Sequence, residues 1–64
     1  MDRRELEQHL RAHGSEFQRH GGRHDIWINR TTRKTATVPR HSPIKRGTVR
    51  SICKKLSAPL PPGF

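Results

Sequence analysis

The sequence predicts a small α+β domain with the element order α-β-β-β-α, in which a three-stranded antiparallel sheet carries both helices on one face. Three observations support this prediction. Apolar residues recur at helical spacing near the start and in the last third of the chain, and alternate with polar residues in between. Glycine, proline and polar turn residues separate these segments. The 64 residues provide material for one thin core.

Residues 2–13 are expected to form the first helix. Asp2 suits the N-cap position, where a short polar side chain can accept hydrogen bonds from free backbone N–H groups. Leu6 and Leu10 lie four residues apart and therefore share one narrow apolar face. Gly14 follows, at the position where a left-handed residue commonly ends a helix.

Two short strands, residues 15–20 and 23–29, are expected to form a hairpin. The intervening Gly21-Gly22 pair suits a two-residue turn, because glycine adopts positive φ without steric cost. Phe17 is the expected core residue of the first of these strands.

The alternation of the second strand divides its side chains between two faces. Ile26 and Ile28 share one face, which is taken as the core face. Arg23, Asp25 and Trp27 share the other. Trp27 is therefore expected to be half exposed, unless a bulge turns it inward.

A third strand and a second helix complete the predicted fold. Residues 34–38 form the strand, with Ala36 and Val38 facing inward. After a loop at 40–44, the helix is expected to begin near Lys45, and its apolar face comprises Val49, Ile52, Cys53 and Leu56. This arrangement is the plan of a double-stranded-RNA-binding domain.

The chain is expected to form one domain over residues 1–56, followed by a proline-rich tail, residues 57–64, that is extended or disordered and cannot be helical. Cys53 is the only cysteine, so no intrachain disulfide can form. No apolar run is long enough to span a membrane, and no signal-peptide core follows Met1. A cytoplasmic protein without a membrane association is expected.

Charge is strongly segregated along the chain, whose formal net charge is +9. All five acids lie in the first 25 residues, where five arginines balance them, and the segment from Ile26 onward has nine basic residues and no acid. Such segregation indicates a side that faces a polyanion, with nucleic acid favoured over an acidic protein. A merely solubilising basic surface remains the alternative, although solubility requires no such separation of sign.

His24 is the candidate for acid–base chemistry, because imidazole takes and gives protons near neutral pH. It follows the Gly-Gly pair directly after Arg23, at the mouth of the hairpin. The alternative interpretation is an ordinary polar residue of the turn.

Other chemistries find little support in the sequence. His9 and His13 share a helix face, and His20 and His24 flank the turn, but neither pair has a second pair of ligands nearby. Neither a metal nor another cofactor is therefore expected. Cys53 belongs to an apolar face, where a thiol is inert, and no G-x-S-x-G or P-loop motif is present.

Cleavage of RNA requires fewer catalytic groups than these chemistries, because RNA carries its own nucleophile in the 2′-hydroxyl. A protein needs only to move protons and to stabilise the charged transition state. His24 suits the acid or base role, and His41 is either a second such group or a loop histidine. The candidates for gripping RNA are Arg23, Arg40, His41, Lys45, Arg46 and Arg50.

Three segments together resemble the HicA family of toxins, which are mRNA interferases of type II toxin–antitoxin systems. They are G-R-H-D-I-W at 22–27, T-V-P-R-H at 37–41 and I-K-R-G-T-V-R-S-I at 44–52. The family pattern has a glycine, a small residue, a histidine and an aromatic residue three positions later, then T-V-P-x-H and I-x-x-G-T-[LV]-R-x-I. The resemblance extends over nearly all of residues 2–56, in the same order and spacing.

This resemblance implies a double-stranded-RNA-binding-like fold, cleavage of mRNA independently of the ribosome, and neutralisation by a HicB-type antitoxin. It implies that His24 is the catalytic histidine, and we expect a monomer or an assembly formed only through the antitoxin. Two features depart from the family pattern. Arg23 stands where a small residue is usual, and the tail after Leu56 has no clear counterpart.

Two rival functions remain open from the sequence. The first is a passive module of the same fold that binds RNA by shape and cleaves nothing; the presence of His24 at the motif position separates it from a nuclease. The second is a small basic protein that mainly docks on an acidic antitoxin and binds RNA incidentally.

Overall fold

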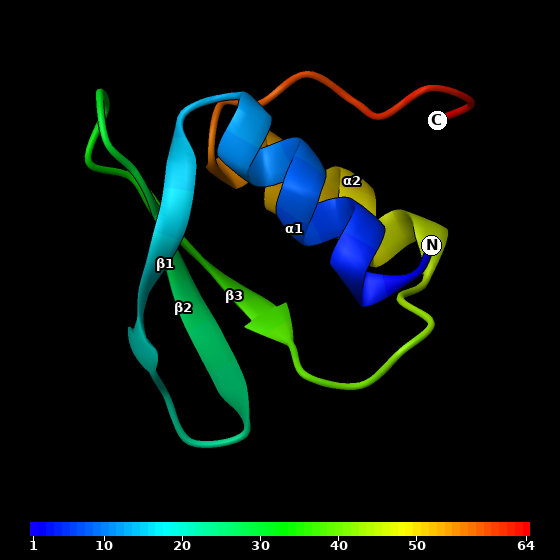
Figure 1. Cartoon of the computed structure of the whole chain (residues 1–64), viewed down its shortest axis with the longest axis horizontal. Helices are drawn as coiled ribbons and strands as arrows, with labels where there is room; N and C mark the ends of the chain where they lie inside the picture. Colours follow the sequence, from blue (N-terminus) through cyan, green and yellow to red (C-terminus); the bar gives the residue numbers. More distant parts are fainter.

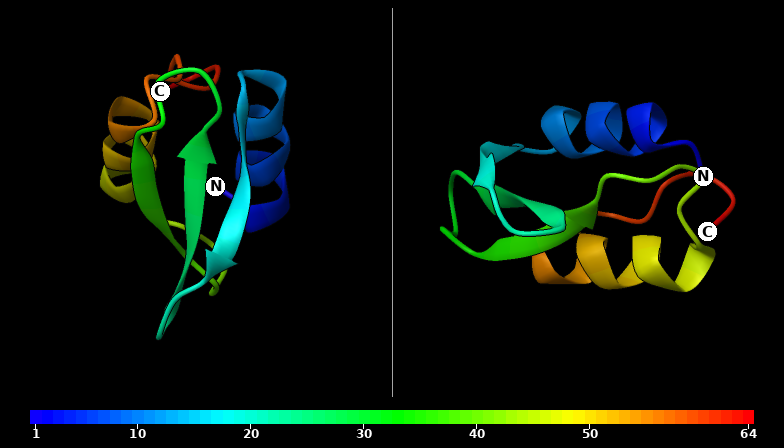
Figure 2. Two further views of the ribbon diagram at one scale, coloured as in Figure 1. Left: turned by 90° about the vertical axis from the view of Figure 1, so that its left-hand side faces the viewer. Right: turned by 90° about the horizontal axis from the view of Figure 1, so that it is seen from below.

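The structure, a computed structural model, describes all 64 residues. Its elements are α1 (Arg3–Ala12), β1 (Ser15–His20), β2 (His24–Asn29), β3 (Thr35–Pro39) and α2 (Arg46–Lys55). The strands form one antiparallel sheet in the order β1-β2-β3. Both helices lie on the same face of this sheet (Figures 1 and 2). The predicted α-β-β-β-α fold is confirmed.

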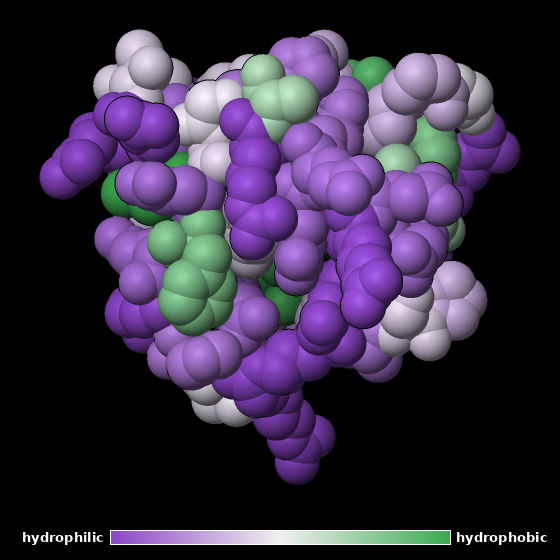
Figure 3. Space-filling view, in the orientation of Figure 1, coloured by the Kyte–Doolittle hydropathy of each residue, from purple (hydrophilic) through white to green (hydrophobic).

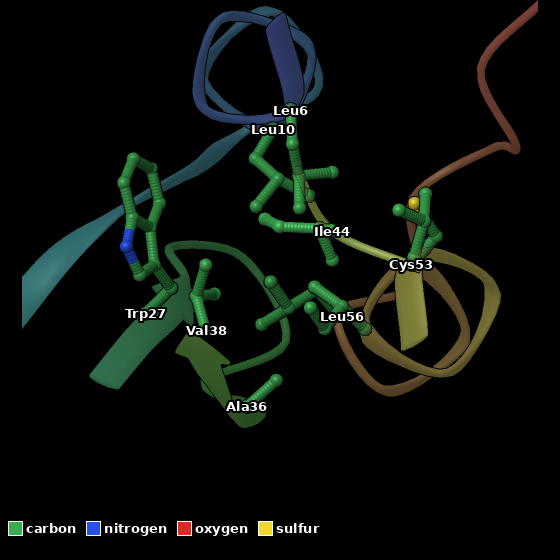
Figure 4. Close-up of a cluster of buried hydrophobic side chains, with 10 residues drawn as sticks. Leu6, Leu10, Trp27, Ala36, Val38, Ile44, Cys53 and Leu56 are labelled. Atoms are coloured by element: carbon green, nitrogen blue, oxygen red, sulfur yellow. The ribbon is translucent and has the colours of Figure 1, made fainter. Parts of the chain in front are cut away.

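The core lies between the sheet and the two helices, with α1 packed on β1 and α2 packed on β3. Figure 4 shows side chains from both helices and from the sheet converging there, with Ile44 between the helices. The buried cluster comprises Leu6, Leu10, Trp27, Ala36, Val38, Ile44, Val49, Ile52, Cys53 and Leu56. The predicted apolar faces of both helices and the inward positions of β3 are therefore confirmed.

Trp27 is buried, with 1% of its surface exposed, whereas Ile26 and Ile28 are only half-buried on the opposite, open face of the sheet. The predicted assignment of these faces was wrong. β2 is the central strand, and the space between it and the helices is wide enough for an indole, which buries far more apolar area than an isoleucine. No bulge in β2 is involved; the irregularity lies in β1, between Phe17 and Arg19.

Phe17 is 40% exposed, so its predicted core role is also wrong. β1 is an edge strand, and only its first residue, Ser15, is buried, because α1 covers only the beginning of the strand (Figure 1). The Phe17 ring instead packs edge-on against the His20 ring, with 5.0 Å between the ring centroids.

The β1–β2 connection has three residues, Gly21, Gly22 and Arg23, instead of the predicted two, and neither glycine adopts a positive φ. Glycine is required at the first position for a different reason. The Gly21 N–H donates to the His24 carbonyl over 2.8 Å, and a Cβ on Gly21 would lie 2.8 Å from that same oxygen. The close approach of the two backbones excludes a side chain.

Asp2 occupies the N-cap position of α1, as predicted, but its side chain does not cap the helix. Ser42 from the loop before α2 does so instead. Its Oγ accepts the Arg3 N–H at 3.2 Å and donates to Asp2 Oδ1 at 2.9 Å. Two backbone bonds between Met1 and Ile44 hold the same segments together.

Asn29 is buried and joins the end of α2 to the β2–β3 turn. Its Nδ2 donates to the Leu56 carbonyl over 2.7 Å, and its Oδ1 accepts the backbone N–H groups of Thr31 and Thr32. A single side chain thereby fixes the position of this turn relative to the helix.

The tail contains no helix, as predicted, and no strand, and it folds back over the helices with Pro61 buried. His9 Nε2 donates to the Pro59 carbonyl over 2.6 Å. Arg46 donates to the Gly63 carbonyl and places its guanidinium over the Phe64 ring.

Trp27→Ala is expected to reduce the free energy of unfolding by about 3–5 kcal/mol, because it empties the largest buried volume of the core. Ile28→Ala on the open face serves as the control and is expected to cost about 1 kcal/mol. Urea denaturation followed by circular dichroism measures both values. Equal losses would show that the two faces of β2 contribute alike.

Candidate functional site

His24 is the first residue of β2 and pairs with Pro39, the last residue of β3. The hairpin that carries it extends beyond the ends of both helices (Figure 2). Because side chains alternate along a strand, His24 lies on the open face together with Ile26, and it is exposed. An imidazole in this position is accessible to a large ligand.

Arg40 fixes the shape of the hairpin beside His24. Its Nε donates to Asp25 Oδ1 at 2.9 Å, its Nη1 donates to the Gly22 carbonyl at 3.0 Å, and its Nη2 donates to the Gly21 carbonyl at 2.9 Å. These bonds join the end of β3 to the β1–β2 connection. They use three of the five N–H donors of the guanidinium, so that two remain for a ligand.

Asp25 is the centre of this arrangement, since it also accepts a 2.9 Å hydrogen bond from Nδ1 of His20. The hydrogen bond from Arg40 is the main reason that the pKa of Asp25 lies below its usual range, and the bond from His20 acts in the same direction. Burial partly opposes them. Asp25 is therefore a stable anion that holds Arg40 in place.

The structure divides the candidate RNA-gripping residues into two groups. Arg23 precedes His24 in the hairpin connection, Arg40 bonds that connection, and His41 follows Arg40 in the loop after β3. Lys45, Arg46 and Arg50 lie at the start of α2 and along it, at the far end of the loop that follows β3 (Figure 1).

The residues on α2 differ in their availability. Arg46 is engaged by the tail, through Gly63 and Phe64. Arg50 and Lys45 are exposed, and none of the ion pairs in the structure involves either of them.

Arg19 is a neighbour of His24 that sequence reasoning missed. It pairs with Ile26 and therefore shares the open face with His24. Simple alternation from Ser15 would direct Arg19 toward the helices, but the irregularity after Phe17 shifts the register by one residue. No local signal in the sequence marks this shift.

The segregation of charge along the chain becomes a segregation in space. The acids lie on α1 and β1, just before α1 and at the start of β2. β3 has no charged residue, α2 carries four basic residues and no acid, and the other basic residues after Ile26 lie in the turn before β3 and in the loop after it. Side chains on the face shown in Figure 3 are mostly hydrophilic. One side of the molecule is thus suited to a polyanion.

The remaining histidines bind the backbone. His9 contacts Pro59, and His13 Nδ1 donates to the His9 carbonyl over 2.9 Å. The structure brings together no group of three or more His, Cys, Asp or Glu side chains that could hold a metal ion. Neither helix is long and apolar enough to cross a membrane.

Comparison with protein-family models gives a match to the family described as "HicA toxin of bacterial toxin-antitoxin", over residues 3–57. The chain belongs to the HicA toxin family. The matched segment includes every element of the fold and His24, and it ends before most of the tail. No curated protein and no solved structure gives a significant match to the chain.

HicA toxins are generally RNase-type toxins, and membership of the family implies an antitoxin partner. In this HicA chain, the match places His24 and the hairpin held by Arg40 within the family's domain.

Asp25→Asn is expected to lower the free energy of unfolding by about 1–2 kcal/mol at neutral pH, because a charged hydrogen bond to Arg40 is removed. The folded-state pKa of Asp25 is depressed, so its contribution is present above the unfolded pKa of about 3.9 and disappears as the pH falls through the folded pKa. Urea denaturation across this pH range measures the difference.

The matched control for this prediction is Glu16→Gln, which removes an exposed carboxylate 4.0 Å from Arg30. It is expected to leave stability unchanged at both ends of the range. A deficit of Asp25→Asn that persisted in strong acid would contradict the role given to the carboxylate.

Proposed function

We propose that this HicA-family chain is a metal-independent endoribonuclease that cleaves mRNA, with His24 as its catalytic acid/base. The observation that carries the proposal is the position of His24, exposed at the end of a hairpin that Arg40 clamps, with Arg23 next to it in the chain and Arg19 on the same face of the sheet. The family match adds a toxin–antitoxin context in which RNase-type activity is general.

The proposed reaction uses the nucleophile of the substrate. His24 takes the proton of a ribose 2′-hydroxyl, the 2′-oxygen bonds to the adjacent phosphorus, and the 5′-oxygen of the next nucleotide leaves with a proton. His41, in the loop directly after β3, is the candidate donor of that proton. The products are a 2′,3′-cyclic phosphate and a 5′-hydroxyl end.

Cations near His24 stabilise the additional negative charge that develops on the phosphate. Arg40 has two free N–H donors and is already held rigidly, so it requires little reorganisation to act. Arg23 lies next to His24 in the connection, and Arg19 lies on the same face of the sheet.

A HicB-type antitoxin is the proposed partner, which neutralises the toxin in the cytoplasm by covering His24 and the basic α2 side with an acidic surface. The support is the absence of acids from β3 and α2, since a complementary charge favours docking there. The chain by itself is proposed to be monomeric. A toxin–antitoxin complex in which both surfaces stayed open would contradict this proposal.

A non-catalytic RNA-binding module is the second candidate function, favoured by the basic α2 side alone. It predicts binding without cleavage and no special role for His24. The two candidates therefore differ in one measurement, the cleavage of RNA by the purified protein.

His24→Ala is expected to slow RNA cleavage by about 10²–10⁴-fold, because a positioned acid or base contributes an effect of this size. His24→Gln is expected to behave alike and to abolish growth inhibition. Gel analysis of a defined RNA measures cleavage, and circular dichroism confirms folding.

The control is His13→Ala, which removes an exposed histidine at the end of α1. It is expected to retain the cleavage rate of the parent. A folded His24→Ala protein that cleaves at the parental rate would remove the proposed catalytic role.

EDTA is expected to leave the cleavage rate unchanged, because proton transfer by imidazole and charge stabilisation by guanidinium require no ion. The measurement is the rate with chelator, compared with the rate after EDTA treatment and addition of Mg²⁺. A large drop in EDTA that Mg²⁺ restores would refute the metal-independent mechanism.

A further inference from the structure

A shallow hollow opens at the end of the molecule opposite His24. Its lining contains no apolar residue and comprises Arg33, Lys34, Thr35, Ser51, Lys54 and Lys55. We call this feature the basic hollow. It is the only pocket in the structure, and it contains none of the residues assigned above to RNA cleavage.

Two separate parts of the chain form the walls of the basic hollow. The end of the β2–β3 turn and the first residue of β3 form one wall, and the C-terminal half of α2 forms the other. Ser51, Lys54 and Lys55 follow the i, i+3, i+4 spacing that places side chains on one side of a helix.

Asn29 connects these two walls. It bonds the Leu56 carbonyl at the end of α2 and the N–H groups of Thr31 and Thr32 in the turn. The cations of the hollow therefore sit on walls whose separation is fixed before any ligand binds. Such preorganisation lowers the entropic cost of binding.

The hollow gathers positive charge that no carboxylate in the protein pairs with. None of the four ion pairs in the structure involves a residue of its lining. Lys54 and Lys55 lie in the last turn of α2, where the helix dipole favours cations, but its partial charge of about −0.5 offsets only a fraction of the charge of four cations. An anionic ligand would relieve the mutual repulsion of the lysines and the arginine.

The chemistry of the lining favours a nucleic acid over a protein. Protein interfaces usually require apolar or aromatic anchors at their centre, and the hollow has none. Phosphodiester oxygens, in contrast, are bound by lysine, arginine and the hydroxyls of serine and threonine. The exposed hydroxyls of Thr35 and Ser51 complete this set.

We propose that the basic hollow binds the phosphodiester backbone of the RNA substrate, as a second binding surface remote from His24. This inference rests on the proposed function, because it takes RNA as the ligand. Thr35, the first residue of β3, lines the hollow, and Pro39, the last residue of β3, pairs with His24. At about 3.3 Å per residue, the two places are roughly 13 Å apart along the strand. One RNA strand of several nucleotides can therefore reach both.

The test compares two charge-matched double variants. Lys54→Gln/Lys55→Gln removes two cations of the basic hollow, and Arg4→Gln/Arg11→Gln removes two exposed cations of α1. Each lowers the formal charge by two. The probe is a fluorescein-labelled, 2′-O-methylated single-stranded RNA, which has no free 2′-hydroxyl and stays intact whether or not His24 is catalytic.

Fluorescence anisotropy over a range of salt concentrations measures the affinity. The Lys54→Gln/Lys55→Gln variant is expected to bind more weakly and to reduce the slope of log K against log [salt] by about 1.4, that is, about 0.7 for each phosphate that is no longer neutralised. The Arg4→Gln/Arg11→Gln control is expected to keep the parental slope. Equal effects of both variants, or none for the first, would overturn the proposal.

Fluorescein-labelled poly-L-glutamate, measured in the same way, represents an acidic protein ligand. If the hollow variant bound poly-L-glutamate more weakly but kept the parental RNA slope, the hollow would be a protein site and the proposal would be wrong. Because no arm measures cleavage, failure here leaves the assignment of His24 untouched, and failure of His24→Ala leaves this test intact.

Discussion

The burial of Trp27 in the central strand is the constraint on which the rest of the structure depends. Trp27 is 1% exposed and lies between the sheet and the helices. Because side chains alternate along a strand, this fixes the face on which every other side chain of β2 lies. Asp25 and Asn29 must then share the helix side with it, and His24 must face the open side. The same alternation puts a clamp for the hairpin at one end of the strand, through Arg40, and a link to α2 at the other.

As a consequence, different side chains hold the loops at the two ends of the sheet. At the hairpin end, Asp25 and Arg40 hold the loop so that His24 is presented without being buried. At the opposite end, Asn29 holds the turn against α2, where the lysines gather. Neither end is stabilised by a large core of its own. Both rely on a few hydrogen bonds to side chains at the margin of one small cluster.

The irregularity in β1, the edge strand, changes which of its side chains face the helices. By shifting the register after Phe17, it brings Arg19 to the face of His24 and His20 to the side of Asp25. The charge of the hairpin is thereby distributed over both faces. All acids lie before Ile26, so β3 and α2 contain none, and the charges of α2 are all positive. In the proposed function, this asymmetry is what the toxin presents to RNA.

The sequence by itself determined the element order, the apolar faces of the helices, the segregation of charge and the likeness to HicA toxins, because each is written in local spacing or in a linear motif. Tertiary structure alone decided which side of β2 faces the helices, how Arg40 is used, and that the tail packs against Arg46 and His9. These features depend on close packing and on hydrogen bonds between residues 15 to 50 positions apart. The order of polar and apolar residues does not specify the volume of the space that Trp27 fills, nor which groups the Arg40 guanidinium bonds.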